Sequence, residues 1–325
     1  MRPRVYVTRL IPDEAIKKLA ENLEYRIWEG ELPVPRDVLF REIPFVDGVL
    51  SLLTDKIDGQ LMDAAPKLRV ISNLAVGFDN IDMREATKRK IMVCNTPEVL
   101  TDTTADFAFA LMLCAARRVV EGERIVRAGK WKTWGPMTLL GRDVHHATLG
   151  IIGLGRIGRE VAKRARGFCM KTIYYDLARN PEKEKAFGLE FRDLRDLLAE
   201  SDFVTIHCPL LPETHHLIGE EQLKIMKRTA ILVNTARGPI VDPKALYNAL
   251  RNRQIAYAAL DVTEPEPIPQ NDSLLTLDNI LIVPHIASAS VATRTKMAIL
   301  AVENLLAGVK GEKPKNIVNS EVFAP

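Results

Sequence analysis

The chain has 325 residues, 47% of them hydrophobic and 27% charged, which is ordinary for a globular protein and enough for two domains. The formal net charge is only +3, and no block of Lys and Arg stands out, which argues against a nucleic-acid-binding protein. No apolar run approaches the length of a membrane span, and the N-terminal residues MRPRVYVTRL are too polar for a signal peptide.

Strand-like and helix-like segments alternate through the first hundred residues. The predicted strands are 4–8, 47–53, 68–74 and 91–95. The predicted helices are 12–22, which opens on Pro and two acids, and 81–90. Such a βαβα rhythm predicts a parallel sheet covered by helices on both faces.

The middle of the chain begins with one long helix, predicted from Thr101 to Arg127 because its apolar residues recur at helical spacing and it contains no Pro. Residues 128–147 are predicted to form a loop. Six strands follow, at 148–152, 172–176, 203–207, 230–234, 256–260 and 280–283. Six is the number that a complete dinucleotide-binding fold needs. A last helix is predicted at about 290–307.

Three glycines follow the strand at 148–152 in the pattern G-x-G-x-x-G. Gly153 would allow a tight turn, Gly155 would let the backbone approach a pyrophosphate, and Gly158 would let the next helix pack on the strand. The N-terminus of that helix offers N–H groups to phosphate. Strand, turn and helix in this order favour a dinucleotide site over a mere packing corner.

The second strand of this series ends on Asp176. A carboxylate at that place can bind the hydroxyls of the adenine ribose, and it repels a 2′-phosphate. We therefore predict NAD(H) as the favoured cofactor, with NADP(H) as the alternative, since Arg179 lies only three residues further on.

Three later segments, NTARGPIVD, LDVTEPEPIP and PHIASAS, lie at or just after predicted strands and supply Arg237, Glu266 and His285. An Arg fork can bind the carboxylate and keto oxygen of an α-keto acid. A His can protonate that oxygen as hydride reaches the carbon. A Glu paired with the His would hold its tautomer and favour its charged form. Singly, each residue also fits a surface or solvated role, and only their joint occurrence favours chemistry.

With these motifs in order and spacing, the sequence resembles the D-isomer-specific 2-hydroxyacid dehydrogenase family over its full length. Within it, the chain is most similar to the glyoxylate/hydroxypyruvate reductases. The resemblance implies an NAD(P)H-dependent enzyme that reduces a small 2-keto acid to the D-2-hydroxy acid, glycolate or D-glycerate. It makes Arg237, Glu266 and His285 the catalytic residues.

The resemblance also implies binding residues. Those expected at the substrate are Leu53, Val76, Gly77, Leu100, Arg237 and Ser288. Those expected at the cofactor are Thr104, Gly153, Gly155, Arg156, Ile157, Gly158, Asp176, Cys208, Pro209, Thr214, Thr235, Ala236, Asp261 and Ala287. Ala287 departs from the family, which usually has Gly there, and its methyl group would narrow the space beside the nicotinamide.

The fold class is predicted to be α/β, with two Rossmann-like domains. A doubly wound NAD-binding domain, residues 99–287, is inserted in a flavodoxin-like substrate domain, residues 1–98 plus 288–325. We expect the site in the cleft between them, where closure would exclude water. Four widely spaced cysteines without metal or redox spacing favour reduced thiols and a cytoplasmic protein.

No metal site is predicted. The pairs His145–His146 and His215–His216 have no cluster of Cys or carboxylates in sequence, and adjacent side chains of an extended loop point apart. A homodimer is implied by the resemblance, with Trp131 and Trp134 on a loop packed against the partner subunit.

Other functions remain open on the same fold. The alternative substrates are 2-ketogluconate, 3-phosphohydroxypyruvate and phosphite, whereas Glu266 argues against formate. A non-catalytic, NAD-sensing corepressor-like protein is the alternative from a different class. Turnover with any 2-keto acid would exclude a pure sensor.

Overall fold

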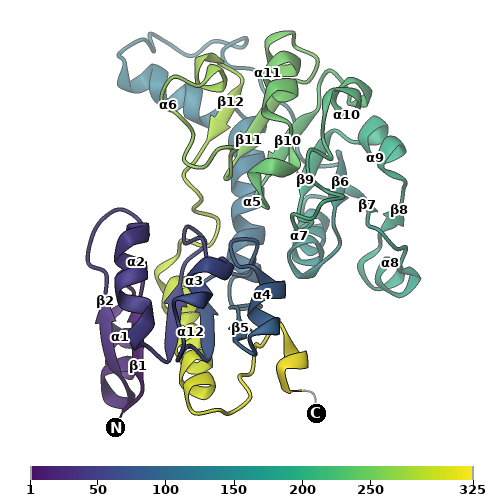
Figure 1. The fold of residues 1–325 in the computed structure, drawn as a ribbon. Helices are drawn as coiled ribbons and strands as arrows, with labels where there is room; N and C mark the ends of the chain where they lie inside the picture. The colour runs from purple at the N-terminus through teal and green to yellow at the C-terminus, as the bar shows by residue number, and fades with distance from the viewer. Residues whose placement is uncertain (1, 324–325) are drawn as a thin grey trace. The chain divides into compact units, whose positions relative to one another are not determined.

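A computed structural model describes residues 2–323 (Figure 1). The chain divides into two compact units. The first comprises the described residues up to Leu100 together with those from Ala289 onward, and the second is Thr101–Ser288. Within residues 2–323, no helix combines the length and apolar character needed to cross a bilayer.

The first unit is built on a five-stranded parallel sheet in the order β2-β1-β3-β4-β5 (Figure 1). Its strands are β1 (Arg4–Val7), β2 (Glu24–Ile27), β3 (Gly48–Ser51), β4 (Val70–Asn73) and β5 (Met92–Cys94). Its helices are α1 (Asp13–Asn22), α2 (Arg36–Glu42), α3 (Gly59–Asp63), α4 (Met83–Lys88) and α12 (Val291–Val309). This strand order is that of flavodoxin-like folds.

The C-terminal helix α12 returns to the first unit and packs on its sheet. The hydroxyl of Ser72 in β4 donates a hydrogen bond of 2.7 Å to the carbonyl oxygen of Ala301. Gly48 in β3 and Gly308 in α12 leave room for this contact. A Cβ at Gly48 would press on side chains of α12, and a Cβ at Gly308 would press on a side chain of β4. The last helix therefore completes a domain whose sheet was formed by the first hundred residues.

The second unit has a seven-stranded parallel sheet in the order β12-β11-β10-β9-β6-β7-β8. The strands are β6 (Thr148–Ile152), β7 (Lys171–Tyr175), β8 (Glu190–Phe191), β9 (Phe203–Ile206), β10 (Ile231–Asn234), β11 (Tyr257–Leu260) and β12 (Ile280–Ile282). The helices are α5 (Thr101–Ala116), α6 (Val119–Arg127), α7 (Arg156–Gly167), α8 (Pro181–Phe187), α9 (Leu194–Glu200), α10 (Glu220–Ile225) and α11 (Pro243–Arg251). The order reverses between β6 and β9, which is the switch point where such sheets bind ligands.

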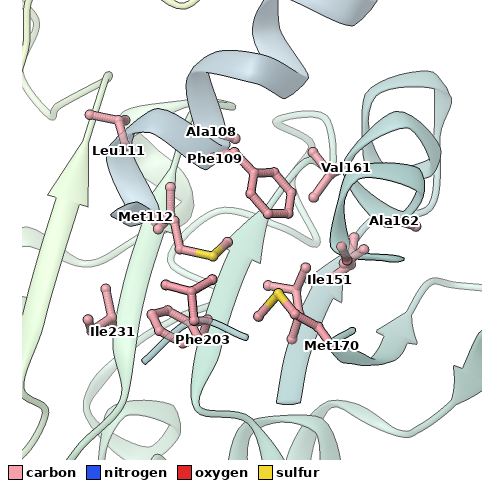
Figure 2. Packing of buried hydrophobic residues seen from close by; sticks show 14 of the residues in the cluster. Ala108, Phe109, Leu111, Met112, Ile151, Val161, Ala162, Met170, Phe203 and Ile231 are labelled. Atoms are coloured by element: carbon pink, nitrogen blue, oxygen red, sulfur yellow. The ribbon is translucent and has the colours of Figure 1, made fainter. Parts of the chain in front are cut away.

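Helix α5 covers one face of this sheet. Figure 2 shows Phe109 and Met112 pointing toward the strands that carry Ile151, Phe203 and Ile231. All five side chains are buried. Strands covered on both faces must be apolar throughout, which is why β6, β9 and β10 read as short continuous apolar runs in the sequence.

The predicted α/β class with two Rossmann-like domains is confirmed. Every predicted strand is present, but two edge strands were missed. β2 is half exposed along its length, and β8 has only two residues, so neither carries the apolar run of a central strand.

The prediction of a single helix over 101–127 is wrong. The chain leaves the helix after Ala116, and Arg118 adopts a left-handed conformation with φ 53° that a right-handed helix cannot contain. The carbonyl oxygen of Ala116 accepts a hydrogen bond of 2.8 Å from the Arg142 N–H instead of continuing the helix. No α6 residue is buried, whereas α5 lies in the core, so the two segments face different surroundings.

Candidate active site

The predicted site residues of the second unit gather at one edge of its sheet, where the parallel strands end. Loops leave this edge after six of the strands and carry Gly153, Asp176, Cys208, Arg237, Glu266 and His285. Because carboxyl ends of parallel strands meet at one edge, residues far apart in sequence become neighbours there.

The glycine turn after β6 is tightly packed on one side and open on the other. Gly153 has φ +93°, and a Cβ there would lie 2.5 Å from the backbone nitrogen of Cys208. A Cβ at Gly158 would overlap the Gly153 carbonyl oxygen, whereas one at Gly155 would meet nothing within 4 Å. Gly155 precedes α7 and offers no side-chain cap, so the first turn of this 12-residue helix can present N–H groups to an anion.

Asp176 ends β7 and is joined to the glycine turn. Its carboxylate accepts hydrogen bonds from the N–H groups of Leu154 at 2.9 Å and Leu177 at 2.8 Å. These two bonds orient the carboxylate beside the glycine turn. They use only part of its capacity, because a carboxylate can accept about four hydrogen bonds.

Arg179 lies three residues after Asp176, but its guanidinium is paired with Glu184 of α8. Two nitrogens of its guanidinium lie 2.8 and 2.9 Å from the two Glu184 oxygens. The Tyr174 hydroxyl donates to the same carboxylate at 3.0 Å. The guanidinium of Arg179 lowers the pKa of the Glu184 carboxyl, mainly through these hydrogen bonds.

Two buried polar atoms near the edge lack a hydrogen-bond partner: Thr235 Oγ1, after β10, and His207 Nδ1, after β9. Burial lowers the pKa of His207 to about 3, so its ring is neutral, and its Nε2 lies 2.9 Å from Thr205 Oγ1. Buried polar atoms without partners are rare in folded proteins. Together with the open glycine turn, they fit an edge built to receive a polar ligand such as a dinucleotide.

Several predicted cofactor residues shape the surrounding loops. The Thr214 hydroxyl donates to the Pro209 carbonyl oxygen and accepts from the Leu211 N–H, both at 2.7 Å, which holds the loop after β9. Burial raises the pKa of the Cys208 thiol to about 11, so it stays protonated and is no nucleophile. Thr104 is buried within α5.

The structure brings Glu266 and His285 together. His285 Nδ1 lies 2.6 Å from Glu266 Oε1, although the two residues follow different strands. Both side chains are partly exposed, at 34% for Glu266 and 23% for His285. A carboxylate that contacts Nδ1 fixes the orientation of an imidazole ring.

Asp261 holds the segment that carries His285. Its buried carboxylate accepts hydrogen bonds from the N–H groups of Ile286 at 2.7 Å and Ala287 at 2.9 Å. Its carbonyl oxygen accepts the His285 N–H at 2.9 Å. Burial raises the pKa of Asp261, and the two N–H donors oppose that rise. Sequence reasoning gave Asp261 only a place beside the nicotinamide and missed this structural role.

Arg237 begins the loop after β10, and this loop abuts the one that carries Glu266. Its carbonyl oxygen accepts a hydrogen bond of 2.8 Å from the Asn234 side chain, and its Nη1 donates to the Ala236 carbonyl oxygen at 2.9 Å. Gly238 lies so close to Thr263 that a Cβ would overlap the Thr263 carbonyl oxygen. Glycine is therefore required for the two loops to approach.

The other predicted substrate residues, apart from Ser288, belong to the first unit. Leu53, Val76 and Leu100 follow β3, β4 and β5, so they lie at the carboxyl edge of that unit's own sheet. Asn side chains secure the loop after β4: Asn95 donates to the Val76 carbonyl oxygen at 2.8 Å, and Asn73 donates to that of Gly77 at 3.0 Å.

The expectation that His215 and His216 point apart is wrong. Their rings stack with centroids 4.0 Å apart, and His216 Nε2 lies 2.7 Å from Glu264 Oε2. His216 has φ 51°, which departs from the extended backbone that the expectation assumed. The local sequence does not predict the contact between His216 and Glu264, because Glu264 follows a different strand.

Comparison with known proteins finds a family and full-length relatives. Residues 109–287 match the family described as "D-isomer specific 2-hydroxyacid dehydrogenase, NAD binding domain". A glyoxylate reductase from Korarchaeum cryptofilum is 56% identical over 323 residues, which is 99% of this chain and 97% of that protein.

Two solved structures resemble the whole chain. A protein from Thermus thermophilus has a TM-score of 0.92 and 46% identity, and the match covers 97% of this chain and 99% of that one. An NADPH-dependent glyoxylate/hydroxypyruvate reductase from Sinorhizobium meliloti, in complex with NADP and malonate, has a TM-score of 0.86 and 33% identity, with coverage of 98% and 97%.

Proposed function

Because the chain belongs to the D-isomer-specific 2-hydroxyacid dehydrogenase family, we propose that it reduces glyoxylate or hydroxypyruvate to glycolate or D-glycerate with a nicotinamide cofactor. The observation that carries this proposal is the 2.6 Å contact between His285 Nδ1 and Glu266 Oε1, placed beside the Arg237 loop. The name glyoxylate reductase, borne by the Korarchaeum cryptofilum relative, supports the substrate.

The proposed mechanism gives each residue one task. A bound dihydronicotinamide supplies the hydride. His285 donates a proton from Nε2 to the keto oxygen, so the product is an alcohol, and Glu266 stabilises the imidazolium before that transfer. Arg237 binds the substrate carboxylate and keto oxygen through its planar fork. For Leu53, Val76, Gly77, Leu100 and Ser288 the substrate-binding role stays a prediction.

The cofactor would lie along the carboxyl edge of the seven-stranded sheet. The first turn of α7, from Gly155 through Arg156, Ile157 and Gly158, would face the pyrophosphate. Thr235 Oγ1, buried without a partner, would be satisfied by a polar group of the nicotinamide half. Ala287 would border the same half, and its N–H is already held by Asp261.

We propose that NADH is preferred over NADPH, and that two features produce the preference. Asp176 offers acceptors to ribose hydroxyls and repels a 2′-phosphate. Arg179 is the cation that would otherwise attract this phosphate, and Glu184 neutralises it in a two-pronged ion pair. The chain would then discriminate against NADPH in two ways. Asp176 repels the 2′-phosphate, and the positive charge of Arg179 is not available to bind it.

Glu184→Gln tests the second feature. We expect it to tighten NADPH binding by a small factor, because loss of the ion pair leaves the Arg179 charge without its carboxylate partner. Asp176→Ala should weaken the binding of NADH and strengthen the binding of NADPH. Dissociation constants from cofactor fluorescence report binding without turnover. Glu182→Gln, which removes the same charge two residues away, is the control, and equal NADPH affinity in Glu184→Gln and wild type would show that Arg179 plays no part.

We also propose a homodimer formed through α6 and the loop that follows it. This segment exposes Trp131, Trp134, Met137 and Leu140, and no α6 residue is buried. Exposed apolar clusters of this kind mark protein contacts. The cytoplasm is the compartment that we propose, since all four cysteines are free thiols.

A double variant, Trp134→Ser with Met137→Ser, should lower the mass measured by light scattering toward that of a monomer. Each of these side chains is 77% exposed in the single chain. Leu32→Ser is the matched control, because Leu32 is 76% exposed but belongs to the first unit. A wild-type mass equal to one chain, or an unchanged mass in the double variant, would overturn this interface.

Initial rates test the proposed activity itself. NADH and NADPH oxidation is followed with glyoxylate, hydroxypyruvate, pyruvate and 2-ketogluconate, and NAD⁺ reduction is followed with phosphite. Rates led by glyoxylate or hydroxypyruvate with NADH are expected. Activity with phosphite alone would reassign the substrate, and tight NADH binding without turnover would favour a sensor.

A further inference from the structure

Two histidines and a glutamate form a compact cluster outside the residues assigned to catalysis. The histidine–glutamate cluster consists of His215, His216 and Glu264, and one ligand atom of each lies within 4.8 Å of the others. His216 Nε2 is 2.7 Å from Glu264 Oε2, and His215 Nε2 is 3.8 Å from Glu264 Oε1. The two Nε2 atoms thus approach the two oxygens of a single carboxylate.

The backbone creates this convergence. In an extended chain, His215 and His216 would project to opposite sides. His216 instead has φ 51°, and the rings stack with an interplanar angle of 28°. The His216 N–H also donates to the Pro239 carbonyl oxygen at 2.8 Å, which anchors the residue. The arrangement is therefore held by the main chain and does not depend on flexible side chains alone.

We propose that the histidine–glutamate cluster binds one divalent transition-metal ion through the two imidazole Nε2 atoms and the Glu264 carboxylate. Imidazole and carboxylate together are a ligand set suited to Zn²⁺, Ni²⁺ or Co²⁺, whereas Mg²⁺ and Ca²⁺ prefer oxygen alone. The partly exposed side chains leave further coordination positions to water. Binding requires both rings to carry their proton on Nδ1. The His216–Glu264 contact must also lengthen from 2.7 Å to about 3 Å or more, so that one ion at about 2.1 Å reaches both atoms, and the stacked rings must rotate until the ion lies near the plane of each.

The location gives this ion a defined effect. Its ligands come from the loop after β9 and the loop after β11, and His216 is tied to the loop after β10. Glu264 lies two residues before Glu266. The ion would cross-link three loops of the carboxyl edge. Its binding to the folded chain would raise the free energy of unfolding, and this effect would grow with the concentration of the ion.

The other histidine pair provides an internal comparison. The rings of His145 and His146 meet edge to face with centroids 5.2 Å apart, and the carboxylate near His145 is that of Asp143, at 3.8 Å. Among residues 2–323, the histidine–glutamate cluster is the group in which three such ligand atoms converge. Loss of His145 and His146 removes two imidazoles without touching the proposed site.

Calorimetric titration of the chelator-treated full chain with Zn²⁺ tests the proposal, without substrate or cofactor. We expect one ion per chain, with affinity reduced about 10- to 100-fold in His215→Ala and in Glu264→Gln, since removing a ligand costs at least as much as removing its supporting partner. Zn²⁺ should raise the melting temperature of the wild type, but not that of these variants. The absorption of Co²⁺ in its place reports the change in ligands directly.

The double variant His145→Ala with His146→Ala is the control and should bind as the wild type does. Far-ultraviolet circular dichroism establishes that each variant is folded. No Zn²⁺ binding to the wild type would overturn the proposal. So would wild-type affinity in both His215→Ala and Glu264→Gln, or a loss of affinity in the control alone. None of these outcomes depends on whether the chain reduces glyoxylate.

Discussion

Replacing His285 with alanine is expected to lower kcat for glyoxylate reduction by about 10²- to 10⁴-fold, the usual contribution of a general acid. The imidazole held by Glu266 at 2.6 Å is the proposed proton donor, so its loss acts on the chemical step. The dissociation constant of NADH should stay close to the wild-type value, because His285 is assigned to the proton and not to the cofactor. Steady-state rates and NADH fluorescence measure the two quantities separately.

The backbone at this position calls for a second variant. His285 has φ 52°, and alanine in the left-handed region adds strain, whereas asparagine tolerates that region well. His285→Asn should therefore fold with less strain and lose as much kcat as His285→Ala. His145→Ala removes an exposed histidine of the same unit and should retain full activity. A kcat near the wild-type value in His285→Asn would contradict the assignment of His285 as the general acid.

Arg237→Met is expected to lower kcat/KM for glyoxylate by about 10²- to 10⁴-fold, since each hydrogen bond to a charged group contributes roughly 1.5–3 kcal/mol and two are lost. The loop itself should survive, because its anchors at this residue include the hydrogen bond from the Asn234 side-chain amide to the Arg237 carbonyl oxygen, which the substitution leaves in place. NADH affinity is expected to change little. Initial rates at low glyoxylate concentration measure kcat/KM directly.

Arg237→Lys separates charge from geometry. Lysine keeps the positive charge but cannot form two parallel hydrogen bonds, so an intermediate kcat/KM is expected. Arg228→Met removes an exposed arginine of the same unit and serves as the control. If Arg237→Met reduces glyoxylate with wild-type kcat/KM, the substrate carboxylate is bound elsewhere and the proposed role is lost.

Apart from the Glu266–His285 pair, which sequence reasoning expected, the side-chain partners across the carboxyl edge could not be inferred from the sequence. Arg179 was read as a cation beside the ribose, but Glu184 holds it. Asp261 was assigned to the cofactor, but its carboxylate accepts the N–H groups of Ile286 and Ala287. Each of these contacts depends on how a loop leaves its strand and on what the next loop offers, which periodicity does not describe.

The amino-acid pattern alone predicted the α/β class, the central strands and the glycine turn, because buried parallel strands must be apolar and a tight turn onto a helix needs glycine. It also indicated that Arg237, Glu266 and His285 follow strands. The end of α5 at Ala116 and the contact between His216 and Glu264 became evident only in the folded chain. Those outcomes depend on strand order and loop packing, where contacts between distant residues override local preference.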